Sequence, residues 1–232
     1  MKTAALWLGL LFAALLLGMP RLAAVAPPVY SRTSFLALFL SHAAMVGAAS
    51  LAAVAAGIAL AVFVTRPAGR DFRGIVLALA TIGQTFPPAA VLALAVPAIG
   101  FGPRPTVVAL FLYGLLPIVG TAIAGLETVP EAVRDAAAGL GMSPGQILRR
   151  VELPLAAPVA LAGIRVSVTI AIGTATIGST VGALTLGTPI LDGLAANKLP
   201  FVVQGAVLVA LFAIVTDLGF ARLEARLRRD TR

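Results

Sequence analysis

The sequence predicts an all-α membrane protein, a polytopic helical bundle with about six spans. Three observations predict it: 60% of the 232 residues are hydrophobic, only 11% are charged, and the mean hydropathy is +1.05. A soluble domain carries about 25% charged residues. This chain could not hide its apolar surface in water, whereas in lipid a helix satisfies its own backbone polar groups. Alanine, leucine, valine and glycine dominate, so helices are the expected elements.

Six apolar stretches are long enough to cross a bilayer, which takes about 20 residues of helix. The expected spans are Thr3–Met19, Phe35–Thr65, Gly74–Ile99, Pro105–Leu126, Leu155–Leu186 and Phe201–Leu223. The first span has an alternative reading as a secretory signal peptide, because Lys2, an apolar run and Ala24-Val25-Ala26 fit that pattern. Cleavage would leave five spans without changing the orientation of the rest, and we favour retention.

The distribution of Lys and Arg predicts that both termini are cytoplasmic. With the N-terminus inside, twelve of the 17 basic residues fall in cytoplasmic segments and four in external segments, and Arg165 lies within the fifth span. The net charge of +8 is therefore a topology signal, and no nucleic-acid partner is expected. The expected divisions are an N-terminal span and external loop (1–34), a transmembrane domain (35–224) with a cytoplasmic loop (127–154), and a basic tail (225–232).

Several kinds of site find no support in the sequence. There is no cysteine for a disulfide or thiolate, and the lone His42, expected to be a satisfied polar residue near the start of its span, cannot form a metal cluster. No G-x4-G-K-[ST] loop occurs, so the chain has no recognisable means of binding ATP. An ion-coupled secondary transporter would ordinarily use intramembrane carboxylates, and Asp217 is the only acidic residue inside an expected span above its last turn. An integral-membrane enzyme would need a cluster of His, Cys or carboxylate side chains for its chemistry, and the sequence offers none.

The long cytoplasmic segment between the fourth and fifth spans predicts two short helices. Thr128-Val129-Pro130-Glu131 fits a capping box with Pro in the first turn, and Gly141 fits a C-terminal stop. Ser143-Pro144-Gly145-Gln146 repeats the start signal, and Pro154 is expected to end the second helix.

The first of these helices is expected to carry an apolar face made largely of small residues. The face consists of Val129, Val133, Ala136, Ala137 and Leu140. Small side chains let a helix approach a partner closely, so the face suits insertion into a groove on another subunit. The alternative is a helix that packs against its own bundle or lies at the membrane interface.

The same segment carries a resemblance to a known family. Asp135-Ala136-Ala137, three residues, Gly141, nine residues and Val151-Glu152-Leu153-Pro154 resemble the EAA loop of ABC importer permeases, E-A-A-x3-G-x9-I-x-L-P, with Asp for Glu and Val for Ile. The resemblance implies the type I ABC importer transmembrane domain, in which this loop forms coupling helices that dock into a cleft of the ATPase. The coupling residues it implies are Asp135, Ala136, Ala137, Leu140, Gly141, Val151, Leu153 and Pro154.

Three further segments resemble the permeases for glycine betaine, choline, carnitine and related osmoprotectants. They are Gln84-Thr85-Phe86-Pro87, the run from Leu112 to Ile118, and the run from Ile172 to Gly178. After the last segment that family usually reads G-A-G-G-L-G, whereas this chain reads Gly182-Ala183-Leu184-Thr185-Leu186-Gly187. The resemblance implies a permease for a quaternary-ammonium osmoprotectant, with an amino acid or another small solute as the alternative cargo.

The resemblance also implies the assembly in which the chain works. The expected partners are ABC ATPase subunits that carry ATP and Mg, a second permease subunit, identical or homologous, and an external solute-binding protein. The chain itself is expected to bind no cofactor. The expected location is the bacterial inner membrane.

Polar residues within the spans are candidates for the translocation path, because such side chains tend to face the bundle interior and a weakly polar lining suffices. The candidates are Gln84, Thr85, Thr174, Thr176, Ser179 and Thr180. Alternatively, their hydroxyls bond to their own helix or join neighbouring helices. Gly178 and Gly182 form a G-x-x-x-G spacing. Arg165 and Asp217 are expected to extend toward the interface, and an ion pair between them is the less favoured alternative.

Overall fold

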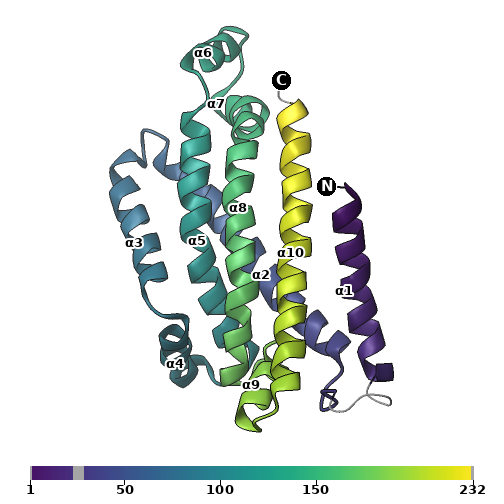
Figure 1. Cartoon of the computed structure of the whole chain (residues 1–232). Helices are drawn as coiled ribbons and strands as arrows, with labels where there is room; N and C mark the ends of the chain where they lie inside the picture. The colour runs from purple at the N-terminus through teal and green to yellow at the C-terminus, as the bar shows by residue number, and fades with distance from the viewer. Residues whose placement is uncertain (1, 23–28, 231–232) are drawn as a thin grey trace. The chain divides into compact units, whose positions relative to one another are not determined.

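The computed structural model describes residues 2–22 and 29–230, and all the secondary structure in this part of the chain is helical (Figure 1). The long helices are α2 (Phe35–Val64), α5 (Pro103–Glu127), α8 (Leu153–Ala175) and α10 (Leu199–Asp230). The other α-helices are α1 (Lys2–Leu22), α3 (Arg73–Thr85), α4 (Pro88–Ile99), α6 (Glu131–Gly139), α7 (Pro144–Ile147) and α9 (Thr188–Ala195). Two 3₁₀ segments, η1 (Arg70–Phe72) and η3 (Thr176–Val181), and one π-helical segment, η2 (Leu148–Glu152), complete the list. The all-α prediction is confirmed.

Within the described residues, four helical runs are long and apolar enough to cross a membrane, or five if a bent pair counts as one span. The four are Phe35–Val64, Pro103–Glu127, Pro144–Val181 and Leu199–Leu227. The apolar part of α1, Leu6–Gly18, is shorter. The prediction of six spans is therefore not confirmed. Residues 24–26, on which the signal-peptide alternative depends, lie outside the described residues.

The predicted span Gly74–Ile99 is wrong as one continuous helix. The bent pair lies here: α3 ends at Thr85, α4 begins at Pro88, and Pro87 between them is extended, with ψ 138°. Proline has no N–H to donate, and it pushes the residue before it away from the helical region. Two consecutive prolines therefore interrupt the helix.

The predicted span Leu155–Leu186 also ends earlier than expected. The α-helix stops at Ala175, η3 follows, and Gly182 ends it with φ +84°. The two glycines of the G-x-x-x-G spacing do different things. A Cβ on Gly178 would lie 2.5 Å from Thr106 Oγ1, so Gly178 permits close packing against α5, whereas Gly182 supplies a left-handed turn.

The chain divides into two compact units, which are described separately. Unit one contains residues 1–49, 86–111 and 168–219, and unit two contains residues 50–85, 112–167 and 220–232. The helices α2, α5, α8 and α10 each contribute residues to both units. The three-part division expected from the sequence stays a prediction.

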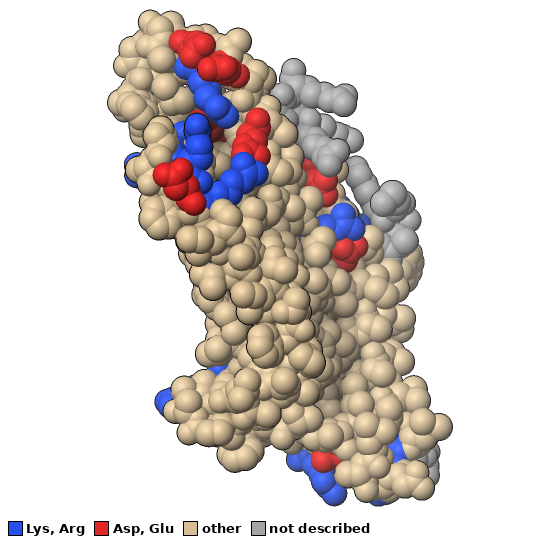
Figure 2. All heavy atoms as spheres, turned by 90° about the vertical axis from the view of Figure 1, so that its left-hand side faces the viewer, with Lys and Arg blue, Asp and Glu red and all other residues tan. Residues whose placement is uncertain are grey.

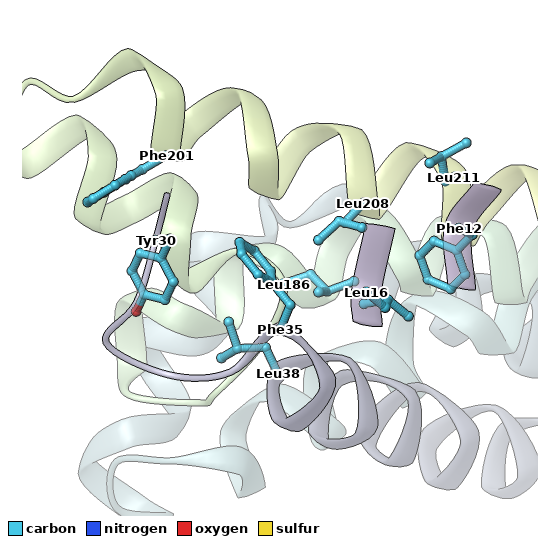
Figure 3. Packing of buried hydrophobic residues seen from close by; sticks show 9 residues of the cluster. All are labelled: Phe12, Leu16, Tyr30, Phe35, Leu38, Leu186, Phe201, Leu208 and Leu211. Atoms are coloured by element: carbon cyan, nitrogen blue, oxygen red, sulfur yellow. The ribbon is translucent and has the colours of Figure 1, made fainter. Parts of the chain in front are cut away.

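The core of unit one is rich in aromatic side chains. Figure 3 shows a buried cluster drawn from α1, α2, α10 and the loops before α2 and α9. Its members are Phe12, Leu16, Tyr30, Phe35, Leu38, Leu186, Phe201, Leu208 and Leu211. Within it the rings of Tyr30 and Phe201 meet edge to face at 5.4 Å between centroids, a favourable aromatic geometry.

His42 joins three segments of unit one. Its side chain is fully buried; Nε2 lies 3.1 Å from the carbonyl oxygen of Ile172 in α8, and the N–H of Leu186 donates to Nδ1 at 3.2 Å. A neutral imidazole with its proton on Nε2 satisfies both contacts. The expectation of a satisfied polar residue near the start of α2 is confirmed, and His42 holds the loop that follows η3.

The loop before α2 is fixed to α9 by polar contacts within unit one. The Tyr30 hydroxyl donates to Asp192 Oδ2 at 3.0 Å, and Arg32 Nη1 lies 3.3 Å from the same oxygen. Burial, and then the hydrogen bond and charge of Asp192, raise the pKa of the Tyr30 phenol above its usual value of 10.0.

The core of unit two is built from smaller aliphatic residues of α2, α5 and α8. The cluster consists of Ala61, Val64, Val119, Ala122, Ile123, Leu126 and Ala156. Helices α5 and α8 approach closely at Gly163, which has no Cβ. A Cβ there would lie only 2.4 Å from the carbonyl oxygen of Pro117. Figure 1 shows α6 and α7 lying past the ends of α5 and α8.

Candidate coupling site

Helix α6 begins two residues later than the sequence indicates, because its N-cap is Pro130 and not Thr128. Pro130 is extended at ψ 140°, and no side chain caps the helix. The predicted capping box that starts at Thr128 is wrong, because the Thr128 hydroxyl donates to the carbonyl oxygen of Gly125, 2.7 Å away in the last turn of α5. The Thr128 hydroxyl therefore closes α5 instead of opening α6.

The end of α6 agrees with the prediction. Gly141 has φ +79°, its N–H donates to the carbonyl of Ala138, and the N–H of Met142 donates to the carbonyl of Ala137. This pair of bonds is the Schellman arrangement, in which a left-handed residue satisfies the last carbonyls of a helix. Glycine suits this position because it has no Cβ to clash. The chain then turns at once into α7.

The predicted start of α7 is also confirmed. The backbone N–H of Ser143 donates to Gln146 Oε1 at 2.8 Å, which is one half of a capping box. The predicted end is wrong, because Pro154 does not stop the helix. The π-helical segment η2 follows α7, and the N–H of Leu153 donates to the carbonyl of Leu148. Pro154 then lies in the first turn of α8, where a missing N–H is tolerated.

The predicted apolar face of α6 is divided between the interior and the surface. Val129 and Ala137 are buried within unit two, whereas Val133, Ala136 and Leu140 are exposed, Leu140 by 80%. Small and apolar residues are therefore available to a partner on one side of the segment. Of the other residues of the motif, Asp135, Gly141 and Pro154 are exposed and Val151 and Leu153 half-buried. Their role in coupling stays a prediction.

A buried charge network lies behind this surface. Glu152, only 2% exposed, closes η2. Arg66, in the turn after α2, donates to both of its carboxylate oxygens, and Arg134 Nε of α6 lies 3.0 Å from Oε1. The Nη2 group of Arg134 also donates to the carbonyl of Leu126 in α5 at 2.8 Å. One carboxylate thus connects α2 and α6 with the start of α8.

A polar cavity of about 270 Å³ opens beside the network. Its charged lining residues are Arg66, Arg70, Arg73, Glu127, Arg134 and Glu152. Arg73 forms a two-point ion pair with Glu127, with both side chains more than 40% exposed. Figure 2 shows basic and acidic side chains mixed together at this end of unit two, the end that carries α6. Such a surface suits a charged protein partner rather than lipid tails.

The path candidates of unit one lie in the last turn of α8 and in η3. The hydroxyls of Thr176 and Thr180 donate to the carbonyls of Gly173 and Ile177, three residues earlier. Ser179 Oγ lies 2.7 Å from Thr185 Oγ1, and Thr174 is half-buried. The backbone bonds match the alternative reading, but a satisfied hydroxyl can still face a path, so the lining role stays a prediction.

The other two path candidates belong to unit two. Gln84 Nε2 donates to the carbonyl of Tyr113 in α5 at 2.7 Å, and the Thr85 hydroxyl donates to Ile82 of its own helix. Arg165 faces Glu224 of α10 at 3.6 Å, a partner that the sequence did not suggest.

The sequence analysis does not predict the charge network. In the motif Glu152 is the variable position between Val151 and Leu153, and Arg66 and Arg134 are two of the basic residues counted on the cytoplasmic side. The available signal was a lone carboxylate between two apolar residues at the start of an apolar run. A single sequence does not show which cations meet such a group.

Comparisons with known proteins agree on one family. Residues 53–229 match the family described as binding-protein-dependent transport system inner membrane component. The osmoprotectant import permease protein OsmY of Salmonella typhimurium is 42% identical over 82% of this chain and 80% of that protein. The choline transport system permease protein OpuBB of Bacillus subtilis is 41% identical over 66% of this chain and 71% of that protein.

Solved structures give the same fold. A chain of the MetNI methionine ABC transporter, crystallised in inward-facing conformations, superposes with a TM-score of 0.71 at 21% identity, covering 85% of this chain and 99% of that one. A chain of an amino acid ABC transporter gives a TM-score of 0.63 at 17% identity, covering 84% and 92%.

Proposed function

Because the chain belongs to the family of binding-protein-dependent transport system inner membrane components, we propose that it is a permease subunit of an ATP-driven importer, and that α6 and α7 couple it to a separate ATPase. It is a multi-pass inner-membrane protein. The observation that carries the coupling proposal is the surface of α6. Val133, Ala136 and Leu140 are exposed on a short helix that is fixed from behind by buried charges and closed by Gly141.

In this proposal the chain forms part of the translocation path and changes conformation in response to the ATPase. Two permease subunits, identical or homologous, enclose one route through the bilayer. ATP and Mg bind to the ATPase subunits, and the closure of those subunits moves α6 and α7. An external solute-binding protein delivers the cargo. The neutral candidates Gln84, Thr85, Thr174, Thr176, Ser179 and Thr180 offer weak polar contacts, which let a solute leave as readily as it enters.

The proposed orientation places α6 and both termini in the cytoplasm. The arginines of unit two support it, because Arg66, Arg70, Arg73, Arg134 and Arg149 all belong to the unit that carries α6. Positive residues collect on the cytoplasmic side of membrane proteins. The ATPase, which needs cytoplasmic ATP, would then meet α6 directly.

The proposed cargo is a quaternary-ammonium osmoprotectant such as glycine betaine, choline or carnitine. The names of several relatives at 36–42% identity support this class of cargo. Uptake into proteoliposomes that contain the assembled transporter tests it with labelled betaine, choline, carnitine and methionine. Uptake of the first three compounds supports the proposal, and uptake of methionine alone contradicts it.

Cross-linking tests the coupling proposal directly, because the chain has no cysteine and any introduced thiol is unique. A cysteine at Leu140 is expected to cross-link to a cysteine in the docking cleft of the ATPase. The matched control is a cysteine at Val129, which belongs to the same predicted face but is buried. Cross-linking at residue 140 and none at 129 supports docking through the exposed face. No cross-link from residue 140 in an assembled, ATP-hydrolysing complex contradicts it.

A further inference from the structure

Glu152 is a buried carboxylate that the docking surface does not use. It is 2% exposed and lies at the last residue of η2, directly before α8. A carboxylate loses the hydration that stabilises its charge when it is buried, and it regains that stabilisation only from well-placed donors. The stability of the Glu152 charge therefore depends more strongly on the positions of its neighbouring groups than the charge of a surface glutamate does.

The two cations that pair with Glu152 come from different parts of unit two. Arg66 follows α2 and contacts both carboxylate oxygens, and Arg134 belongs to α6. Arg134 also donates to the carbonyl of Leu126 near the end of α5. Any displacement of α6 relative to α2 must either break a contact to Glu152 or carry Glu152, and with it the start of α8, along.

The pair formed by Arg73 and Glu127 provides a contrast in the same cavity. It has the same two-point geometry, but its side chains are 43% and 47% exposed. Water can replace either partner there, and exposed ion pairs contribute little. At the network the arginines are each 36% exposed but the Glu152 carboxylate is only 2% exposed. Separation would leave that buried charge without its partners, which costs more than separating the exposed pair.

The π-helical geometry of η2 places this carboxylate where a helix is least regular. The wider turn from Leu148 to Glu152 connects α7 to α8 without a loop. Segments of this kind occur often at functional sites. Because η2 is continuous with α8, motion of the coupling segment can enter α8 through η2, at the residue that the two arginines hold.

We propose that Glu152 is the positioning residue that passes the motion of α6 to α2 and α8, so that ATP hydrolysis by the partner is converted into transport. This inference rests on the proposed function and goes beyond it, because it assigns transmission to a group that does not touch the partner. Loss of the carboxylate leaves the docking face in place and loosens its connection to the spans.

The test measures uptake per ATP hydrolysed in proteoliposomes that contain the complete transporter. Glu152→Gln removes the charge with little change in size. The variant is expected to bind the ATPase and hydrolyse ATP, while uptake per ATP falls at least tenfold. Glu127→Gln is the matched control, because it makes the same substitution at the exposed pair in the same cavity, and its ratio is expected to stay within twofold of the unmodified protein.

The ratio of uptake to ATP hydrolysed distinguishes a loss of transmission from a general structural defect. A merely structural defect lowers uptake and hydrolysis together, so an unchanged uptake per ATP in Glu152→Gln overturns the inference. If Glu152→Gln does not assemble, Arg66→Lys decides, because it keeps the charge and loses the two-point contact. At least a threefold fall in its ratio supports the inference, and an unchanged ratio overturns it. Failure of the unmodified chain to bind an ATPase would instead overturn the proposed function.

Discussion

Unit one and unit two each bury a polar side chain almost completely, but they satisfy it in different ways. In unit one, His42 is held by two backbone groups, the carbonyl of Ile172 and the N–H of Leu186. In unit two, Glu152 is held by the side chains of Arg66 and Arg134. Both residues connect separate segments, but His42 does so through neutral backbone groups and Glu152 through the charges of two side chains. Under the inference drawn above, the contacts of Glu152 pass on motion, whereas those of His42 hold a fixed arrangement.

The largest effect is expected from Gly141→Asp, which attacks the turn between α6 and α7. The φ of +79° costs a non-glycine residue about 1–2 kcal/mol, and the new charge lies on the proposed docking surface. Transport is expected to fall to background while the amount of protein in the membrane stays unchanged. Uptake assays and immunoblots of membranes measure the two quantities.

Gly145→Asp is the control for that variant. Gly145 also has open space around it, and its φ is not positive, so the same carboxylate enters without backbone strain. At least half of the transport should remain. Normal uptake by Gly141→Asp would remove the main support for a docking role of this turn.

His42→Leu is expected to have the next largest effect, and it acts on unit one. It leaves the buried N–H of Leu186 without its acceptor, which costs about 1–3 kcal/mol, and removes the contact to the carbonyl of Ile172. We expect the free energy of unfolding to fall by about 1–3 kcal/mol, measured by thermal unfolding in detergent. Ser50→Ala is the control, because that buried hydroxyl of α2 has no hydrogen-bond partner. Equal stability of His42→Leu and the unmodified protein would show that the backbone contacts are not important.

Gly187→Ala tests whether η3 and the loop that follows it in unit one can deform. The new Cβ would lie 2.3 Å from the carbonyl oxygen of Thr176, and a backbone atom cannot move aside as a flexible side chain can. Overpacking of this kind costs about 1–3 kcal/mol. Gly173→Ala, whose Cβ meets nothing within 4 Å, should be neutral in the same unfolding measurement. A neutral Gly187→Ala would mean that η3 and the loop after it are deformable.

Tyr30→Phe is expected to have the smallest effect, a loss of about 1 kcal/mol, because one hydrogen bond to Asp192 disappears. The raised pKa of Tyr30 sets the pH dependence. A group whose folded pKa exceeds its unfolded value of 10.0 stabilises the fold below pH 10 and loses that contribution as the pH rises through the folded pKa. The two proteins should therefore converge in stability above pH 10. A constant difference between them across that range would contradict the assignment.

Much of the fold could be predicted from the sequence, because long apolar runs and turn residues are local signals. Helices α2, α5 and α10 begin within two residues of their predicted starts, and Gly141 and Ser143 act as expected. The errors occur where several local signals compete. Hydropathy alone predicts one continuous span where Pro87 and Pro88 interrupt the helix. The Thr128 hydroxyl bonds to the last turn of α5 and does not cap α6.

Only part of the candidate site could be predicted from the sequence. The motif located the segment and its turn, but not which side of α6 is exposed. The π-helical turn before Pro154 and the partners of Glu152 arise from contacts between α2, α6 and α8. Arg66 and Glu152 are 86 positions apart, and no local rule connects residues at that separation.

The central claim is that the exposed face of α6 meets an ATPase from the cytoplasmic side. Labelling of a single cysteine at residue 140 with a membrane-impermeant maleimide tests it most directly, because this position is 80% exposed in the chain alone. The account predicts labelling in inverted vesicles but not in right-side-out vesicles, and protection when the ATPase is bound. Labelling from the external side, or labelling that the bound ATPase does not reduce, would contradict it.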